Sequence, residues 1–456
     1  YKRSNNLAFA GRLNYAFKSK YLLALTYRAD GASRLSPDKR WDYFPSVSAA
    51  WNISDEGFMK NVSWIDNLKL RASYGTTGNY SINPYSTQST LSSFTNLGFA
   101  EAAQSYYYFN QYIGNKNLGW EKSTTTNIGV DFSLVKNRLS GSVEVYNVKT
   151  TGLLYGRLQP RSSGSVSNGV MFEIMENIGE TNNKGIEIAL NANIISKKDF
   201  NWNSTVTFTS NKEKITKLVD GQDILNGTDP ETKSLLIGRP VASFYSFKKL
   251  GIWQTDEAAK AAELTFGNLP FQPGDMKIED VNGDGIIDTK DQQYLGSSVP
   301  KFVLGWQNNV TYKNFDLGVY MFVRYGQTIR AEFLTRYNPS GVGNSFAEFD
   351  YWTPENPTND FPRPAKGGQF INYPAYQGFN FVDGSFFKIK NVTLGYTVPQ
   401  SITSKLRVDK IRVYATANNF FTFSKSHLLK NYDSERGGGE SNPLMRQIVF
   451  GVNLGL

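Results

Sequence analysis

The chain has 456 residues, of which 40% are apolar and 14% aromatic, and its formal net charge is +9. A low apolar content with many aromatic residues suits a sheet with one apolar face better than a buried globular core. No apolar run reaches about 18 residues, which excludes a transmembrane helix; a membrane β-barrel remains allowed because its hydropathy signal is weak. The 49 Lys and Arg residues are scattered, so we expect no nucleic-acid partner. The lack of cysteine excludes disulfide and thiol chemistry.

Apolar and polar side chains alternate along most of the chain, which is the period of a strand with one apolar face. The last segment is typical, with Ile448, Phe450, Val452 and Leu454 on one parity. In chain order we expect about thirteen strands, at 7–17, 21–27, 44–53, 67–75, 128–134, 139–145, 184–195, 200–210, 301–312, 315–326, 385–398, 407–418 and 448–456. The alternation therefore predicts an all-β protein built from an antiparallel sheet.

The connections between these strands alternate in length. Short turns are expected at 18–20, 136–137, 196–199, 313–314 and 399–406, and long loops at 76–120, 150–183, 211–300, 327–384 and 419–443, with 31–43 and 54–66 intermediate. Short turns on one rim and long loops on the other are typical of outer-membrane barrels. Aromatic residues near strand ends, such as Tyr15, Phe17, Tyr21, Trp202 and Tyr312, fit an interfacial girdle, although β-propensity explains any single one equally well.

An odd number of strands predicts an open sheet. An open edge in lipid leaves backbone N–H and C=O groups without partners, at a cost of several kcal/mol each. We therefore expect the missing strands to come from an upstream part of the same polypeptide or from another chain. The sequence opens at Tyr1-Lys2-Arg3, without Met, and enters a strand almost at once, so we expect the C-terminal part of a longer precursor.

Five blocks of sequence carry a family resemblance. They are Trp51-Asn52-Ile53-Ser54-Asp55-Glu56 with 68–79, Leu118-Gly119-Trp120-Glu121-Lys122, Asn177-Ile178-Gly179-Glu180 with Asn183-Lys184-Gly185-Ile186-Glu187, Pro273-Gly274-Asp275 running into 280–285, and Phe450-Gly451-Val452-Asn453-Leu454. In this order along the chain they resemble the SusC/RagA family of TonB-dependent transporters. One departure is the final residue, Leu456, because the family usually closes on an aromatic residue.

The resemblance implies a transmembrane antiparallel β-barrel of about 22 strands in the outer membrane of Bacteroidetes, in contact with membrane lipid. Residues 1–456 would be its C-terminal part, and 211–300 a long extracellular insert; the plug domain and first strands lie outside this sequence. It also implies import of oligosaccharides or peptides, a SusD-like surface lipoprotein as partner, and energy from the TonB complex through the N-terminal part. Such a protein binds and gates substrate, so no enzymatic activity is expected.

One motif suggests a metal site. Residues 280–291 match an EF-hand-type loop, with oxygen ligands expected from Asp280, Asn282, Asp284, Asp288, Asp291 and the carbonyl of Ile286. Ligation by oxygen alone favours Ca²⁺ over transition metals, and Asp291 in place of the usual bidentate Glu weakens binding or favours Mg²⁺. The alternative is an acidic, glycine-rich turn without metal. Replacing Asp284 with Ala is the test.

Other candidates are weaker. Tyr106, Tyr107 and Tyr108 in an outer loop, and Trp352, have rings able to stack on sugars, but packing between loops explains them better. His427 is expected in a loop with no Ser, Cys or acidic partner near it, so a catalytic triad is not expected. The run 437–439 lacks the strand, helix and Lys of a phosphate loop and indicates a flexible loop.

Four basic residues, Arg12, Lys69, Arg71 and Arg412, fall on the polar parity of their strands, which faces the lumen of a barrel. They line the transport path or pair with the plug domain, and the sequence does not distinguish these two roles.

Two other functions compete with import. A secreted, calcium-binding β-rich adhesin or glycan-binding module predicts a water-soluble monomer without detergent. A surface glycosidase needs two positioned carboxylates, and a hydrolysis assay tests it.

Overall fold

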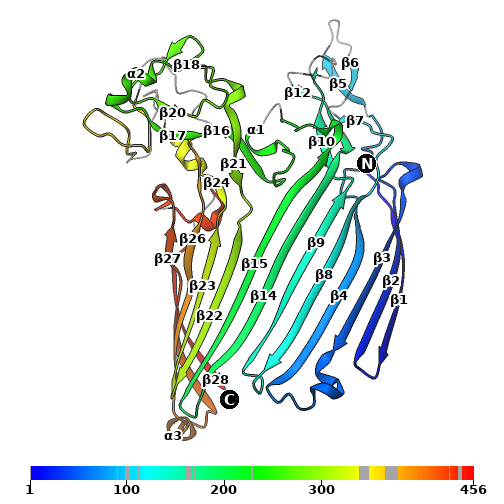
Figure 1. Cartoon of the computed structure of the whole chain (residues 1–456), viewed down its shortest axis with the longest axis vertical. Helices are drawn as coiled ribbons and strands as arrows, with labels where there is room; N and C mark the ends of the chain where they lie inside the picture. The colour runs from blue at the N-terminus through cyan, green and yellow to red at the C-terminus, as the bar shows by residue number, and fades with distance from the viewer. Residues whose placement is uncertain are drawn as a thin grey trace. The chain divides into compact units, whose positions relative to one another are not determined.

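The structure is a computed structural model that describes residues 2–89, 91–97, 103–109, 112–160, 162, 166–167, 170–226, 230–337, 349–364, 378–430, 432–439 and 444–455. Thirteen strands within these residues form one sheet, in the order β1-β2-β3-β4-β8-β9-β14-β15-β22-β23-β26-β27-β28 (Figure 1). Their bounds are Asn6–Phe17, Tyr21–Ala32, Trp41–Asn52, Ile65–Asn79, Glu121–Leu134, Leu139–Thr151, Gly179–Ser196, Phe200–Leu218, Phe302–Tyr312, Phe315–Tyr325, Phe386–Thr397, Lys410–Ser424 and Gln447–Gly455. Every expected strand is present, and the all-β fold with an antiparallel sheet is confirmed.

The connecting segments hold smaller elements. The short strands are β5 (Leu91–Leu97), β6 (Ala103–Phe109), β7 (Tyr112–Ile113), β10 (Leu154–Leu158), β11 (Val166–Ser167), β12 (Val170–Met171), β13 (Glu173–Asn177), β16 (Ser243–Phe247), β17 (Lys249–Ile252), β18 (Thr265–Phe266), β19 (Leu269–Pro270), β20 (Met276–Ile278), β21 (Gln292–Ser297), β24 (Thr328–Arg330) and β25 (Phe381–Asp383). The helices α1 (Pro230–Lys233), α2 (Ala258–Ala261) and α3 (Gln400–Thr403) are one turn each. No helix in the described part of the chain is long and apolar enough to cross a membrane.

By its contacts the chain divides into two compact units. The first is Tyr1–Leu190 with Asn211–Gly227 and Leu235–Val241, and the second is Asn191–Ser210 with Thr228–Ser234 and Ala242–Leu456. β14 and β15 contribute residues to both. The first unit contains β1 to β9, and the second contains β22 to β28 and the small sheets of the 211–300 segment.

Tight turns close the hairpins at one end of the strands. Lys18 and Ser19 have φ values of 51° and 55°, and Lys136 and Asn137 have 57° and 59°. Positive φ at successive turn positions matches the right-handed twist of the flanking strands, which is why such short connections suffice. Aromatic rings pair beside these turns: Phe17 with Tyr21 at 6.4 Å between centroids, and Phe315 with Tyr396 at 4.8 Å.

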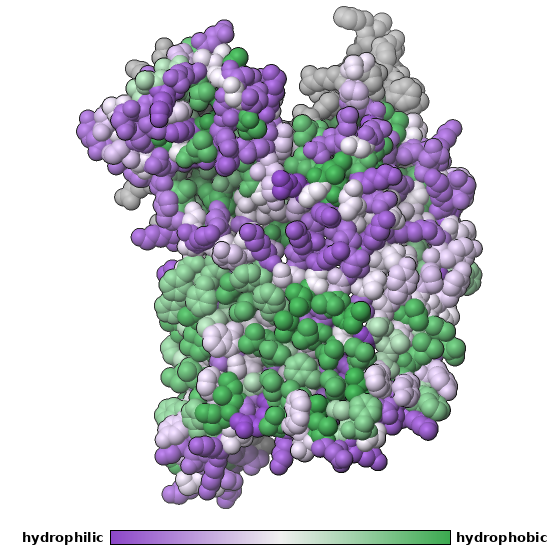
Figure 2. Space-filling view, viewed as in Figure 1, coloured by the Kyte–Doolittle hydropathy of each residue, from purple (hydrophilic) through white to green (hydrophobic). Residues whose placement is uncertain are grey.

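One face of the sheet carries exposed apolar side chains. Leu13 in β1 is 63% exposed and Phe450 in β28 is 80% exposed. On the face of the molecule shown in Figure 2, hydrophobic residues gather over the strands and hydrophilic residues over the loops and turns. A contiguous apolar surface of this kind is not a feature of a water-soluble monomer, and it suits contact with lipid.

Several strands extend beyond their expected bounds, and β15 is the clearest case. β15 continues to Leu218, eight residues past the end that the apolar alternation predicts. The alternation missed this part of the strand because residues 211–218 are mostly polar on both parities. This end of the strand is held instead by a small core of Ile178, Ile215, Leu218 and Leu235, which all belong to the first unit. In this part of β15 the burial of these four side chains stabilises the strand, and an alternating apolar face is not needed.

The expected long loop 211–300 is largely folded. In the second unit a core of seventeen buried apolar residues, here called the loop core, gathers chain segments that are far apart in sequence. It comprises Phe247, Ile252, Trp253, Ala261, Phe271, Met276, Ile278, Ile287, Ile329, Ala331, Leu334, Tyr337, Trp352, Phe361, Phe379, Val382 and Leu429. Residues 242–300 therefore pack together with parts of the later connections 327–384 and 419–443, rather than forming an irregular connection.

Two of the sequence blocks meet in space. The side-chain oxygen of Asn177 accepts from the backbone N–H of Gly119 at 2.8 Å, and its Nδ2 donates to the carbonyls of Gly119 and Gly152. One amide thus joins three connections at the loop end of β8, β9 and β14. Saturating buried backbone groups in this way explains an Asn at that position.

Candidate functional site

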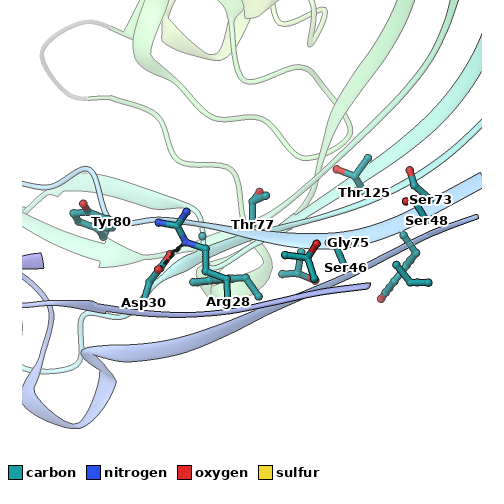
Figure 3. A pocket seen from close by; sticks show the side chains of 15 residues that line it. Arg28, Asp30, Ser46, Ser48, Ser73, Gly75, Thr77, Tyr80 and Thr125 are labelled. Carbon is teal, nitrogen blue, oxygen red and sulfur yellow. Dashed lines mark hydrogen bonds and ion pairs between the residues drawn. The ribbon is translucent and has the colours of Figure 1, made fainter. Parts of the chain in front are cut away.

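A pocket lies on the polar face of β2, β3, β4 and β8, wholly within the first unit. It has a volume of about 630 Å³ and is lined by Thr26, Arg28, Asp30, Phe44, Ser46, Val47, Ser48, Ser73, Tyr74, Gly75, Thr76, Thr77, Gly78, Tyr80 and Thr125. We call it the hydroxyl pocket. Figure 3 shows Ser48, Ser73 and Thr125 near one another at one end, and the Arg28–Asp30 pair with Tyr80 toward the other.

Strand pairing assembles this surface. β3 and β4 pair in a register that sets Ser48 opposite Ser73 and Ser46 opposite Gly75. Facing residues in adjacent strands point to the same side of a sheet, so small residues at alternate positions of each strand combine into one patch. Neighbouring residues of opposite parity, such as Leu25 beside Thr26, are apolar and exposed on the other face.

The charges at the pocket are compensated. Nε of Arg28 donates to both carboxylate oxygens of Asp30 at 2.7 Å. Nearby, Nζ of Lys122 donates to Asp42 at 2.8 Å. Arg28 and Asp30 are the only charged residues among those lining the pocket, so the described lining carries no net charge. The pocket presents hydroxyl groups rather than ions.

Aromatic packing fixes one end of the pocket. The ring of Trp120 contacts Phe44 edge-on at 5.3 Å and Tyr80 edge-on at 4.9 Å. Gly78 leaves the room for these rings, because a Cβ there would overlap Phe44 and lie 2.8 Å from Trp120. The Trp120 indole N–H donates to the carbonyl of Arg40 at 3.1 Å. Tyr80 is thus held by its neighbours and does not swing freely.

Ion pairs account for two of the four basic residues on the polar parity. Arg71 donates to both oxygens of Asp131 and to Glu144, each at 2.8 Å. Arg412 pairs with Asp316 on β23. Arg12 donates to the side-chain oxygen of Asn14 at 3.0 Å. Arg71 and Arg412 are therefore neutralised by neighbouring strands, an arrangement that the sequence alone left open.

The EF-hand-like loop is closed by its own hydrogen bonds. Both oxygens of Asp280 accept backbone N–H groups, from Gly283 at 2.7 Å and Gly285 at 2.9 Å. Asn282 donates to Asp284, and the N–H of Ile286 donates to Asp284 at 2.9 Å. The bond from the Ile286 N–H, followed by that from the Asn282 side chain, lowers the pKa of the Asp284 carboxyl. Gly283 and Gly285 have φ values of 71° and 78°, which explains glycine at the two bends.

The other two carboxylates of the loop, Asp288 and Asp291, also accept hydrogen bonds from the loop itself. Asp291 is fully buried, and its two oxygens accept from the N–H groups of Val281 and Asp288 at 2.9 and 2.7 Å. Across the described ranges, no group of three or more His, Cys, Asp and Glu side chains gathers so as to hold a metal. Asp288 instead accepts from the N–H of Lys290, and its carboxylate lies 3.7 Å from the Lys290 ammonium. Calcium binding by 280–291 therefore stays a prediction.

The aromatic candidates differ in their surroundings. The side chains of Tyr106, Tyr107 and Tyr108 lie outside the described part of the structure. Trp352 is 5% exposed and belongs to the loop core, where its indole N–H donates to Gln254 at 2.9 Å. Its ring packs inside the loop structure, in agreement with the packing explanation, and presents no open face for stacking on a sugar.

The statement that His427 lacks an acidic partner is wrong. Nε2 of His427 lies 2.8 Å from both carboxylate oxygens of Asp360. These residues are 67 positions apart, so only the fold brings them together.

Gly438 in the run 437–439 has φ 98° and packs against the carbonyl of Arg330, a close approach that excludes any side chain.

Residues 1–420 match the family described as TonB dependent receptor-like, beta-barrel, and the chain belongs to this family of outer-membrane proteins. Among its relatives, TonB-dependent receptor SusC of Bacteroides thetaiotaomicron is 30% identical over 476 residues, covering 100% of this chain and 44% of SusC. A TonB-dependent receptor of Formosa agariphila is 35% identical over 474 residues, covering 98% of this chain and 46% of the relative.

A solved structure of the RagAB peptide transporter resembles this chain with a TM-score of 0.77 and 26% identity, covering 99% of this chain and 48% of that chain. The resemblance to SusC/RagA proteins seen in the sequence blocks is thereby confirmed. The chain spans less than half the length of each of these three relatives. They are described as receptors and as a transporter.

Proposed function

We propose that this chain is the C-terminal part of the barrel of a TonB-dependent importer that takes up oligosaccharides or peptides together with a SusD-like surface lipoprotein. The observation that carries the proposal is the match to SusC over the whole chain, supported by the likeness to RagAB. The exposed apolar face of the strands agrees with insertion in the outer membrane. TonB coupling would act through parts of the protein that precede these strands.

The proposed work is binding and positioning. A neutral, hydroxyl-rich wall holds substrate by many weak hydrogen bonds that exchange readily, whereas unpaired charges would trap it. Arg71 and Arg412 are paired with carboxylates, so neither presents an unpaired positive charge on the polar face. The structural relative RagAB is a peptide transporter, so a peptide is one substrate class proposed for this chain, and an oligosaccharide is the other.

Deletion of the complete gene in its host tests the function. We expect the deletion strain to lose growth on one polymeric carbon or nitrogen source and to keep growth on the corresponding monomer. Purification of the complete protein from membranes with a terminal affinity tag should co-purify a surface lipoprotein. Equal growth of both strains on every glycan and protein source tested contradicts the import function.

A secreted adhesin is disfavoured by two observations. The chain belongs to a membrane-barrel family, and apolar side chains cover one face of the strands. An adhesin of this composition would have to bury that face. Solubility of the complete protein without detergent would favour the adhesin.

We also propose, separately, that loop 280–291 binds Ca²⁺. Its support is the spacing of Asp280, Asn282 and Asp284 and the exposure of the Asp284 and Asp288 carboxylates to solvent. Binding would exchange the Asn282–Asp284 hydrogen bond for ligand bonds to the ion. Terbium luminescence of the complete receptor tests this: Asp284→Ala should abolish a calcium-displaceable signal, and Asp256→Ala, outside the loop, should keep it. A signal unchanged in Asp284→Ala shows that the loop holds no ion.

A further inference from the structure

We infer that the hydroxyl pocket is a binding subsite for an uncharged, polyhydroxylated ligand, namely a short stretch of a neutral oligosaccharide. The inference rests on the proposed import function and names the substrate class that this wall of the sheet would contact. Three features of the pocket support the inference: its hydroxyl groups are available, its lining has no net charge, and its shape suits a short oligosaccharide.

The hydroxyl groups are available to a ligand. Among the described contacts, Ser46, Ser48, Ser73 and Thr125 make no side-chain hydrogen bond, and Thr77 makes one long bond of 3.5 Å to a carbonyl. Each free hydroxyl is both a donor and an acceptor. A sugar ring likewise presents several hydroxyl groups that donate and accept, so the two surfaces are chemically matched. At another place on the polar face two such groups bond to each other, as in the 2.9 Å contact between Thr393 and Thr416.

The charge pattern favours a neutral ligand. The one cationic group of the lining, Arg28, is bound by the facing oxygens of Asp30 at 2.7 Å. Desolvating a charged peptide side chain or terminus against a neutral wall has a cost that no opposite charge offsets. Neutral sugars carry no such penalty. The outer N–H groups of Arg28 remain directed to solvent, since 54% of its side chain is exposed, and they can still donate to a sugar oxygen.

The size and rigidity of the pocket suit two or three sugar units. Its volume of about 630 Å³ lies within the range of about 300–1,000 Å³ found for small-molecule sites. Gly75 keeps the floor low, because a Cβ there would lie 2.7 Å from Cβ of Ser46. Tyr80, held by Trp120, offers one fixed ring at the end of the cavity for stacking on a sugar. A preformed site loses little entropy on binding.

Binding by the complete receptor tests the subsite. The probe is a printed array of neutral hexasaccharides together with hexapeptides of positive, negative and zero charge. The test variant is Ser48→Ala, Ser73→Ala and Thr125→Val combined, which removes three hydroxyl groups and adds no bulk. The matched control replaces Thr205, Thr207 and Thr209 of β15, which share the polar parity of their strand and lie outside the pocket, with Val.

We expect wild type to retain at least one neutral hexasaccharide and the test variant to bind it at least tenfold more weakly, since three hydrogen bonds are removed. The control should stay within twofold of wild type. A second variant, Thr125→Phe, fills the cavity and should block the same glycan while the protein keeps its heat-modifiable mobility on gels. Equal glycan affinity in wild type and test variant overturns the subsite, as does retention of charged peptides alone.

The two proposals fail differently. If deletion of the gene impairs growth on a protein source and no glycan binds, import stands and the glycan subsite is overturned. If deletion changes growth on no source while the pocket variants still weaken glycan binding, the subsite stands and the import function falls.

Discussion

The ammonium nitrogen of Lys388 lies 2.6 Å from a carboxylate oxygen of Asp433 and 3.1 Å from one of Glu435. Lys388 is fully buried on β26, and Glu435 also accepts from Lys390 at 2.6 Å. This network fastens segment 432–439, which follows β27, to the second unit's own strands. Burial raises the pKa of the Glu435 carboxyl, but the bonds from Lys390 and Lys388 outweigh it, so the pKa is lowered and the group stays ionised.

Lys388→Met should release segment 432–439. Removing one partner of a buried ion pair costs about 3–5 kcal/mol, because the remaining carboxylates lose their compensating charge. We expect faster hydrogen exchange in 425–439 and a lower unfolding midpoint in detergent. Lys405→Met, an exposed lysine after α3, is the control and should match wild type. Unchanged exchange in the Lys388 variant would show that the segment is held by apolar contacts alone.

Arg71→Gln should destabilise the first unit by about 1–2 kcal/mol, because Asp131 and Glu144 then face each other without a cation. The effect is smaller than for Lys388, since roughly a third of each side chain is exposed. Arg71→Lys should recover only part of the loss, because an ammonium cannot form the bidentate contact. The temperature at which the heat-modifiable gel band shifts measures the effect. Lys69→Gln, two residues away on the same parity, should leave that temperature unchanged.

Gly78→Ala should cost about 1–3 kcal/mol, because the added methyl group overlaps the ring of Phe44 and the packing cannot absorb it. Gly11→Ala is the matched control: it also lies inside a strand, and an added Cβ there meets no atom within 4 Å. Thermal unfolding of the two variants in the same detergent compares them directly. Equal midpoints would mean that the aromatic end of the hydroxyl pocket repacks without strain.

The thirteen strands could be predicted because each obeys one local rule, alternation with period two. The turns followed from the same pattern, since Lys18 and Ser19 stand where the alternation breaks. The end of β15 could not be predicted in this way: Ile215 and Leu218 pack against Ile178 and Leu235, and the charged residues in 211–218 interrupt the alternation that would reveal a strand. Alternation of apolar and polar residues indicates a strand whose two faces meet different surroundings. It gives no signal where a strand end is stabilised by other contacts.

For the candidate sites too, local sequence patterns could be predicted and contacts between distant residues could not. Small residues at alternate positions, such as Ser46 with Ser48 and Ser73 with Thr77, are visible in the sequence, but a pocket appears only when the register sets Ser48 opposite Ser73. The contact of His427 with Asp360 joins residues far apart in sequence, and no local pattern announces it. The EF-hand-like spacing was readable in the sequence, and the bends at Gly283 and Gly285 agree with it, whereas calcium binding there stays a prediction.

Lys249 should titrate near pH 8. Burial lowers the pKa of its ammonium to about 8, opposed by the nearby charge of Asp360, and its Nζ donates to the Asp360 carbonyl at 2.6 Å. The unfolded chain then binds more protons than the folded chain between pH 8 and the ordinary lysine pKa of 10.5, so the free energy of unfolding rises with pH across that interval. The gain is on the order of 3 kcal/mol.

Competitive labelling with acetic anhydride across pH 6 to 11 reads this titration by mass spectrometry, with the exposed Lys260 as internal reference. Lys249→Met should remove the rise in stability above pH 8. An inflection for Lys249 at the same pH as for Lys260 would mean that water reaches the ammonium.

Adjacent residues of one strand should report opposite solvents. Leu394 on β26 is 54% exposed on the apolar face, whereas Thr393 bonds to Thr416 on the polar face. The chain has no cysteine of its own, so a single nitroxide label can be attached at either position through an introduced cysteine. In liposomes, the label at 394 should collide mainly with oxygen, which concentrates in lipid, and the label at 393 mainly with a water-soluble nickel chelate. Equal access of both labels to the chelate would mean that the apolar face of the sheet is not in contact with lipid, and insertion in the outer membrane would then have to be abandoned.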